Sequence, residues 1–256
     1  MLFRAIPPVR RAAGGPHARR WATSLSITSP ALAVLLAGPW VPASAQQFVT
    51  DDAALADLGA CELEAWTGPE ESWVLPVCHL VPGVEITAGA MFADLGRDSW
   101  DPLAVVEAKT LFRDRGEEGW SVGAVVGTAV PTQSQFARPA EVFAYAPLTL
   151  YAQELPVVGH LNLGWSAFRE EAEGTTHTDH FLMWGAKLGV GVLPRIELVG
   201  ELFGLAGEET HAQAGIRTEV VPDRLTLDAS HGMALEGGGN GLGPQVGMAW
   251  TPRPLR

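Results

Sequence analysis

Hydrophobic and charged residues alternate with a period of two along much of this chain. In residues 192–204, VLPRIELVGELFG, Glu197 and Glu201 fall on one face while Leu198 and Leu202 fall on the other. Successive side chains of a β-strand point to opposite faces, so this pattern predicts a strand with one polar and one apolar face.

The same alternation recurs in twelve segments at nearly regular spacing. Most are about ten residues long, which is the length of a tilted strand that crosses a bilayer. The predicted strands span residues 59–67, 72–80, 83–93, 102–113, 120–130, 140–151, 157–168, 179–191, 195–204, 211–220, 224–233 and 243–251.

The connections between these segments alternate in kind. Longer polar stretches such as PTQSQFARP and REEAEGTTHTD alternate with short proline-marked ones such as VPG and VLPR, and DRGEEG is an exception. Long and short connections in turn indicate an up-and-down meander with two unlike ends, as in outer-membrane barrels.

Two all-β folds can present a half-polar strand. A soluble sandwich buries the apolar face, whereas a membrane barrel turns that face to lipid and lines its lumen with polar groups. Small residues such as Ala88, Ala90 and Ala108 on the apolar faces fill a packed core poorly. Glu107 and Lys109 share one polar face, where opposite charges can pair across a narrow lumen. We therefore predict a single up-and-down antiparallel transmembrane β-barrel of twelve strands, with a periplasmic or surface barrel or sandwich as the alternative.

The N-terminal part of the chain has the features of a targeting segment. Residues 1–45 hold five arginines and no acidic residue, then the apolar run ALAVLLAG and the small-residue stretch ASA. We predict a cleaved signal peptide over 1–45, a periplasmic segment over 46–58 and the barrel over 59–256. Loss of the five arginines changes the formal net charge from −12 to −17, which leaves no basic surface for nucleic acid.

The two cysteines predict the register of the first hairpin. An antiparallel hairpin symmetric about the TGPEES turn pairs Trp66 with Trp73 and Cys61 with Cys78. Directly opposed residues lie within disulfide range, and an oxidising compartment favours the bond. The alternative is a pair of buried free cysteines.

The first residues after the predicted signal read QQFVTDDAALADLGACELEAW, with the stretch TDDA at residues 50–53. They resemble the opening of the meta-pathway phenol-degradation family of bacterial outer-membrane proteins. The stretches LNLGW and WGAKLGVGVLPRIELVGELFG are similar in character, although Gln47 stands where that family has proline. The resemblance implies an outer-membrane barrel that passes small, hydrophobic or aromatic compounds. The matching positions are Phe48, Thr50, Asp51, Asp52, Ala53, Gly59, Glu62, Leu63 and Glu64.

Three groups of residues are candidates for other chemistry. His177, Asp179 and His180 could contribute to a metal site, but they fall in a predicted loop and have no evident fourth ligand. His160 and Ser166 share a polar face but lie about 20 Å apart along one strand, too far for a catalytic pair. The adjacent carboxylates Asp51 and Asp52 belong to a plug, a periplasmic contact or a capped turn. We predict no enzyme activity, no metal and no cofactor.

The function most consistent with the pattern is a passive outer-membrane channel or transporter for small molecules. The alternatives are a non-conducting structural or ligand-binding barrel and an outer-membrane lipid hydrolase. The expected partners are outer-membrane lipid and a small-molecule solute, and no oligomeric state is predicted. The residues expected to line the lumen and set its selectivity are Glu85, Glu107, Lys109, His160, Asn162, Lys187, Arg195, Glu197, Glu201, Arg217, Glu219 and Asp228.

Overall fold

β-Strands are the regular secondary structure in the residues that the computed structural model describes, which are 48–94, 100–114, 119–132, 139–152, 155–172, 175–236 and 241–252. Within these residues no helix is long and apolar enough to cross a membrane. The strands are β1 Cys61–Thr67, β2 Glu71–Val81, β3 Val84–Asp94, β4 Trp100–Arg113, β5 Trp120–Pro131, β6 Glu141–Tyr151, β7 Val157–Ala172, β8 Thr175–Leu193, β9 Ile196–Leu205, β10 His211–Val221, β11 Leu225–Ala234 and β12 Gly243–Trp250.

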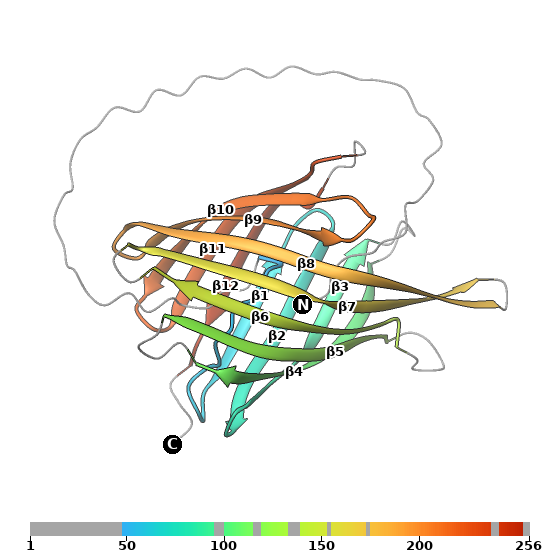
Figure 1. Cartoon of the computed structure of the whole chain (residues 1–256), viewed down its shortest axis with the longest axis horizontal. Coiled ribbons are helices and arrows are strands. Elements are labelled where there is room, and N and C mark those ends of the chain that lie inside the picture. The colour runs from blue at the N-terminus through green and yellow to red at the C-terminus, as the bar shows by residue number, and fades with distance from the viewer. Residues whose placement is uncertain are drawn as a thin grey trace, which may run out of the picture.

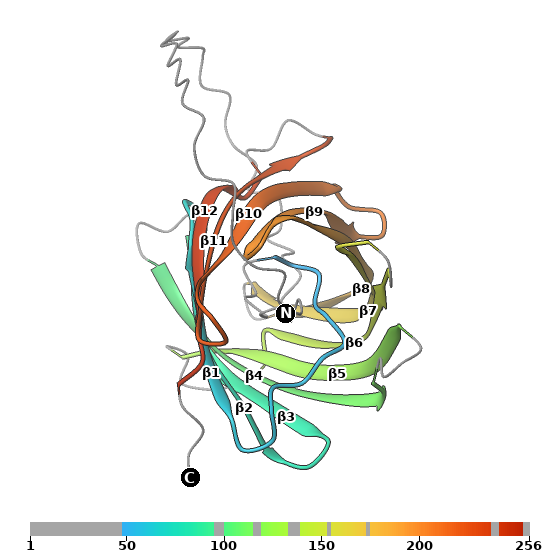
Figure 2. The same ribbon diagram turned by 90° about the vertical axis from the view of Figure 1, so that its left-hand side faces the viewer.

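The twelve strands form one closed antiparallel barrel (Figures 1 and 2). Each strand pairs with its neighbours in sequence, and β1 closes the ring by pairing with β12, where Leu63 lies opposite Trp250. This arrangement confirms the predicted up-and-down barrel. We call the end with the 82–83, 194–195 and 222–224 connections the turn end, and the opposite end the loop end.

Outward and inward residues alternate along the strands. Leu163 is 60% exposed and Leu198 is 48% exposed, whereas His160 and Lys109 are buried inside the ring. The outer surface is therefore apolar and the interior contains ionisable groups, which is the inside-out distribution of a membrane barrel. An apolar cluster also lies inside the barrel, and its large members include Trp66, Trp73, Phe143, Met183 and Phe203.

The first hairpin has the predicted register and the predicted disulfide. Cys61 lies opposite Cys78 and Trp66 opposite Trp73, and the two cysteines are bonded. The rings of Trp66 and Trp73 stack with their centroids 5.2 Å apart on the inner face. The bond fixes this hairpin against a one-residue slip, which would turn every side chain to the wrong face.

The hairpin of β7 and β8 is longer than the sequence pattern predicts. The stretch REEAEGTTHTD, predicted as a loop, is mostly strand, and only residues 173–174 separate the two strands. The hairpin extends beyond its neighbours at the loop end of the barrel (Figure 1). Its polar sequence lacks apolar alternation, so the backbone ladder rather than burial defines these strand ends.

Candidate functional site

The segment that leads into β1 lies inside the barrel (Figure 2). Phe48 and Thr50 are completely buried, and Asp51 and Ala53 are only 1% exposed. Because the ring of strands encloses this segment, we call residues 48–56 the plug. Three roles were considered for the adjacent carboxylates Asp51 and Asp52. The structure agrees with the plug, because the segment that carries them lies within the lumen.

The start of the plug is bound to β9 through a single carboxylate. Glu201 accepts hydrogen bonds from the backbone nitrogens of Val49 and Thr50 at 2.8 Å each. The adjacent strand β8 has a glycine at the point where Thr50 sits, and a Cβ added to Gly185 would lie 2.6 Å from Thr50 Oγ1. The wall is therefore shaped to admit this part of the plug.

Asp51 is the most extensively bound residue of the plug. Its Oδ1 lies 3.1 Å from Lys109 Nζ, and its Oδ2 accepts a hydrogen bond of 2.9 Å from the Tyr145 hydroxyl. With the Asn162 amide oriented to satisfy both of its atoms, its oxygen accepts from Asp51 N at 2.7 Å and its nitrogen donates to Asp51 O at 3.0 Å. Side chains from β4, β6 and β7 thus converge on one plug residue.

The rest of the plug continues toward the turn end with further side-chain contacts. The backbone nitrogen of Ala53 donates to Thr149 Oγ1 at 2.8 Å, and that of Ala56 donates to Glu85 Oε2 at 2.7 Å. The Ala56 carbonyl also lies 2.6 Å from His79 Nδ1. Buried backbone groups of the plug are satisfied in this way without joining the β-ladder, which is what burial requires.

The plug carries two adjacent carboxylates toward the cationic side of the lumen. Asp52 Oδ1 lies 3.1 Å from Lys109 Nζ. Burial would raise the pKa of the Asp52 carboxyl, but the positive charges of Lys109 and Lys187 outweigh burial and hold that pKa below its usual range. Asp52 therefore stays ionised inside the barrel at neutral pH.

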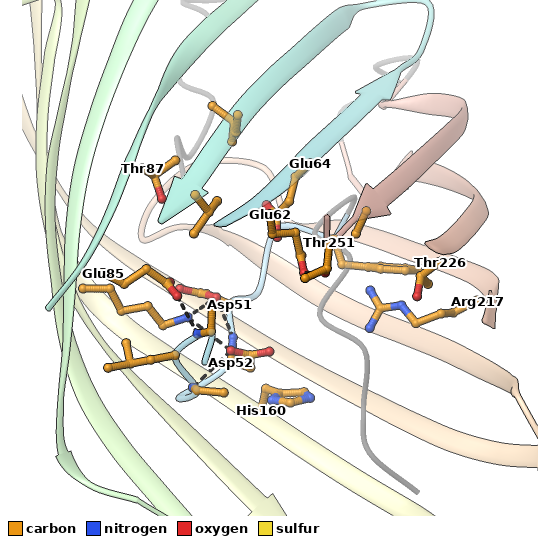
Figure 3. Close-up of a pocket in the computed structure, with 18 of the residues that line it drawn as sticks. Asp51, Asp52, Glu62, Glu64, Glu85, Thr87, His160, Arg217, Thr226 and Thr251 are labelled. Carbon is orange, nitrogen blue, oxygen red and sulfur yellow. Dashed lines mark hydrogen bonds and ion pairs between the residues drawn. The ribbon is translucent and has the colours of Figure 1, made fainter. Parts of the chain in front are cut away.

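A cavity of about 290 Å³ lies beside the plug, with acidic residues on one wall. Glu62 and Glu64 of β1 are close to Thr251, with Arg217 beside them and Asp52 further along the cavity (Figure 3). Glu62 Oε2 accepts a hydrogen bond of 2.7 Å from the Thr251 hydroxyl. The lumen is thus occupied by the plug but not completely filled.

The neighbouring wall, formed by the strands next to β12, contains ion pairs between adjacent strands. Arg217 of β10 contacts Asp228 of β11 at 3.0 Å and Glu197 of β9 at 3.7 Å. Its guanidinium carbon also lies 5.7 Å from the centroid of the Phe48 ring, a cation–π contact with the plug. Arg217 therefore connects the barrel wall to the first residue of the plug.

Eleven of the twelve residues predicted to line the lumen lie on the inner face of the barrel wall. Arg195 is exposed in the two-residue turn between β8 and β9, where its φ is 73°. Charge alternation runs on into this turn, so the pattern cannot separate a turn residue from the first strand residue. The residues on the inner face are Glu85, Glu107, Lys109, His160, Asn162, Lys187, Glu197, Glu201, Arg217, Glu219 and Asp228.

The sequence pattern missed Tyr145 and Thr149, which bind the plug from β6. The inner face of that strand carries Glu141, Phe143, Tyr145 and Thr149, and so has little charge to mark it. The sequence signal for this face is the spacing of two between the aromatic residues Phe143 and Tyr145, both of which are buried in the structure. A lumen predicted from charge alone therefore omits hydroxyl groups, such as the donor of Tyr145 and the acceptor of Thr149.

The candidate catalytic pair is not assembled. Ser166 Oγ donates to Glu141 Oε1 at 2.9 Å, whereas His160 Nδ1 lies 3.0 Å from Thr149 Oγ1. The serine and the histidine thus have different partners, and a nucleophile needs its base within hydrogen-bond reach.

The candidate metal ligands lie on β8 rather than in a loop. His177 Nε2 is 2.8 Å from Asp179 Oδ1, and both side chains are largely exposed. His180 stacks instead on Trp165, with the ring centroids 5.6 Å apart. Among the described residues no three His, Cys, Asp or Glu side chains are arranged to hold a metal ion.

A closed twelve-stranded antiparallel barrel with an apolar outside and an ionisable lumen defines the class of the protein, a bacterial outer-membrane β-barrel. Two solved structures share the fold: "KdgM porin in complex with disordered oligogalacturonate", with a TM-score of 0.56 and 7% identity, and "KdgM porin", with 0.53 and 8%. Each alignment covers 75% of this chain and 98% of the porin. The chain belongs to the family described as uncharacterised conserved protein UCP029691, whose model matches residues 31–241. No curated protein matches it.

Proposed function

We propose that the protein is a passive outer-membrane channel for small solutes, exported by the signal predicted over residues 1–45. The observation that carries this proposal is a barrel lumen lined by ionisable groups, with a cavity beside a plug that the barrel holds by side chains. Withdrawal of such a plug leaves the β-ladder intact and opens a polar path through the membrane. The porins that share the fold support the same function.

The inner surface changes character along its length, which bears on the solute. The turn-end half carries the charged groups around the plug, whereas Trp66, Trp73 and Phe143 belong to an apolar cluster inside the barrel. Aromatic and aliphatic surface favours solutes with an apolar body. The resemblance of the TDDA region to the phenol-degradation family supports the same class, namely small hydrophobic or aromatic compounds.

The charged lumen residues set selectivity in this proposal. The β-ladder places Lys109 opposite Glu85, Lys187 opposite Glu201 and Arg217 opposite Asp228. Each cation therefore has an acid on the adjacent strand, which holds the lumen's charge balance when the plug is absent.

Conductance of the purified barrel in planar bilayers, with swelling of liposomes in small sugars, tests the proposal. We expect Gly185→Val to displace the plug, because an added Cβ lies 2.6 Å from Thr50 Oγ1 and valine adds two further methyl groups, and faster labelling of a Thr50→Cys thiol in the same chain verifies the displacement. The matched control is Gly200→Val on β9, where an added Cβ meets nothing within 4 Å. We expect low conductance for the native chain and the control, and a large increase for Gly185→Val.

A non-conducting barrel is the second candidate, since the plug occupies much of the lumen. It predicts that Gly185→Val inserts as a folded barrel, judged by heat-modifiable migration on a gel, yet conducts no more than the native chain. That outcome would overturn the channel proposal and leave a structural or ligand-binding barrel.

A further inference from the structure

The contacts of Asp51 resemble those that a protein makes with a bound carboxylate ligand. Lys109 and Tyr145 bind different oxygens of the carboxylate, at 3.1 and 2.9 Å, and both side chains are more than nine-tenths buried. Asn162 is also buried and presents both a donor and an acceptor next to them. Charge-assisted bonds from fixed donors are the stronger kind, so this is a built carboxylate site. We call Lys109, Tyr145 and Asn162 the cradle.

The plug occupies the cradle as a separable ligand. Within the described part of the chain, backbone hydrogen bonds between this N-terminal region and the barrel are confined to Gly59 and Ala60, which pair with His79. Residues 48–56 are held by barrel side chains instead. The segment can therefore leave without breaking any strand pairing, while the Cys61–Cys78 bond keeps its base attached.

Departure of the plug leaves the cradle short of acceptors. Lys109 keeps its cross-strand partner Glu85 and the Asn162 nitrogen keeps the Leu161 carbonyl, but the Tyr145 hydroxyl loses Asp51 and the Asn162 amide loses its two bonds to the Asp51 backbone. Lys109 and Tyr145 remain aligned as two donors for one carboxylate, and bonds to a charged acceptor are stronger than bonds to the neutral water of the opened lumen, so another carboxylate is favoured at this position. The Tyr145 ring stacks on Phe143 with centroids 6.2 Å apart, which adds a flat apolar surface beside the cradle.

We propose that the cradle is a binding site for small organic carboxylates with a flat apolar body, and that such a solute competes with Asp51 and displaces the plug. This inference rests on the proposed channel function, because it gives that channel a solute class and an opening signal. Binding of the solute itself needs no conduction, so the two can be tested apart.

Displacement is measured with a reporter thiol, Thr50→Cys in the full chain. Thr50 is fully buried in the seated plug, and both native cysteines are in the disulfide, so the reporter is the one free thiol. Benzoate is the probe, and neutral benzamide of the same shape is its control, with sodium chloride matching the ionic strength. We expect benzoate to accelerate labelling by a small charged reagent about tenfold and benzamide to have no effect. Equal acceleration by both compounds, or none by either, overturns the competition.

Calorimetry with the Gly185→Val chain, whose plug is displaced, tests the site itself. We expect benzoate to bind and Tyr145→Phe in this background to weaken binding about tenfold, since a hydrogen bond to a charged group is lost. Tyr151→Phe, at the other of the two tyrosines, should leave the affinity unchanged. Equal binding of benzoate and benzamide, or equal effects of the two substitutions, overturns the site. A barrel that conducts but shows neither response refutes this inference alone, whereas one that responds without conducting refutes only the channel.

Discussion

The substitution Asp51→Asn isolates the charge that seats the plug. Asparagine has nearly the same shape as aspartate, and with its oxygen toward Lys109 and Asp52 N its amide nitrogen can donate to the Tyr145 hydroxyl, so packing inside the barrel is preserved. What disappears is the negative charge that faces Lys109 at 3.1 Å and Tyr145 at 2.9 Å. A hydrogen bond to a charged group contributes about 1.5–3 kcal/mol against about 1 kcal/mol for a neutral one.

The expected cost to the seated state follows from these two bonds. Asp52 still contacts Lys109 at 3.1 Å, so the lysine is not left unpaired. We therefore expect the free energy that favours the plug inside the lumen to fall by about 2 kcal/mol in total. This raises the ratio of withdrawn to lumen-bound plug about thirtyfold.

The reporter thiol at position 50 reads this ratio directly. When the plug opens and closes faster than the reagent reacts, the labelling rate follows the population of the open form. Asp57→Asn is the matched control, since Asp57 is exposed at the base of the same segment. A labelling rate for Asp51→Asn equal to that of the control would refute the assignment of Asp51 as the main anchor. A double-mutant cycle with Tyr145→Phe then measures the coupling between the two groups.

Three further outcomes are expected. Leu163→Arg places a charge on the lipid-facing surface and should destabilise the barrel by about 2–4 kcal/mol in urea titrations from lipid vesicles, while Leu155→Arg, exposed outside the strands, should have little effect. Replacement of Cys61 and Cys78 by serine removes a disulfide between residues 17 positions apart and should lower the free energy of unfolding by about 3 kcal/mol in the same titration. In reducing buffer the native chain and the serine variant should have equal stability. Because the pKa of Asp52 is held below its ordinary 3.8, its contribution to the seat is complete above that pH and is lost only as the pH falls below it. The ratio of reporter labelling between the Asp52→Asn chain and the chain with native Asp52 should thus stay constant from about pH 7 to 5, and a change of that ratio in this interval would contradict the assignment.

The strands could be predicted from the sequence because one physical signal governs them. A strand between lipid and a polar lumen must alternate, and its length is fixed by the bilayer, so ten of the twelve predicted spans agree with the structure within two residues or so. The exceptions are β7 and β8, which continue into polar sequence beyond the alternating region. In this region the backbone hydrogen bonds between β7 and β8 continue, but both faces of the strands are polar. The hydrophobic pattern therefore cannot show where these strands end.

The contents of the lumen could not be predicted in the same way. Alternation shows that Lys109 and Asn162 point inward but not what they meet there. Asp51 lies 58 residues from Lys109 and 94 from Tyr145 along the chain, and only closure of the ring brings them together. The sequence identifies Asp51 and Asp52 as candidate functional carboxylates, but their partner Lys109 is evident only from the structure of the barrel.

The balance of charge around Lys109 explains why a plug seated by buried groups can still be exchangeable. Lys109 faces three carboxylates, with Glu85 opposite it in the ladder and Asp51 and Asp52 each 3.1 Å away. Lys187 also attracts Asp52, so the plug is held by charge attraction and not by a closed network of strand pairing. Withdrawal leaves Lys109 with its barrel partner, so the open lumen does not contain a cation without a neighbouring acid. A single carboxylate from a solute needs to replace only the contacts of Asp51 with Lys109 and Tyr145 to compete for this position.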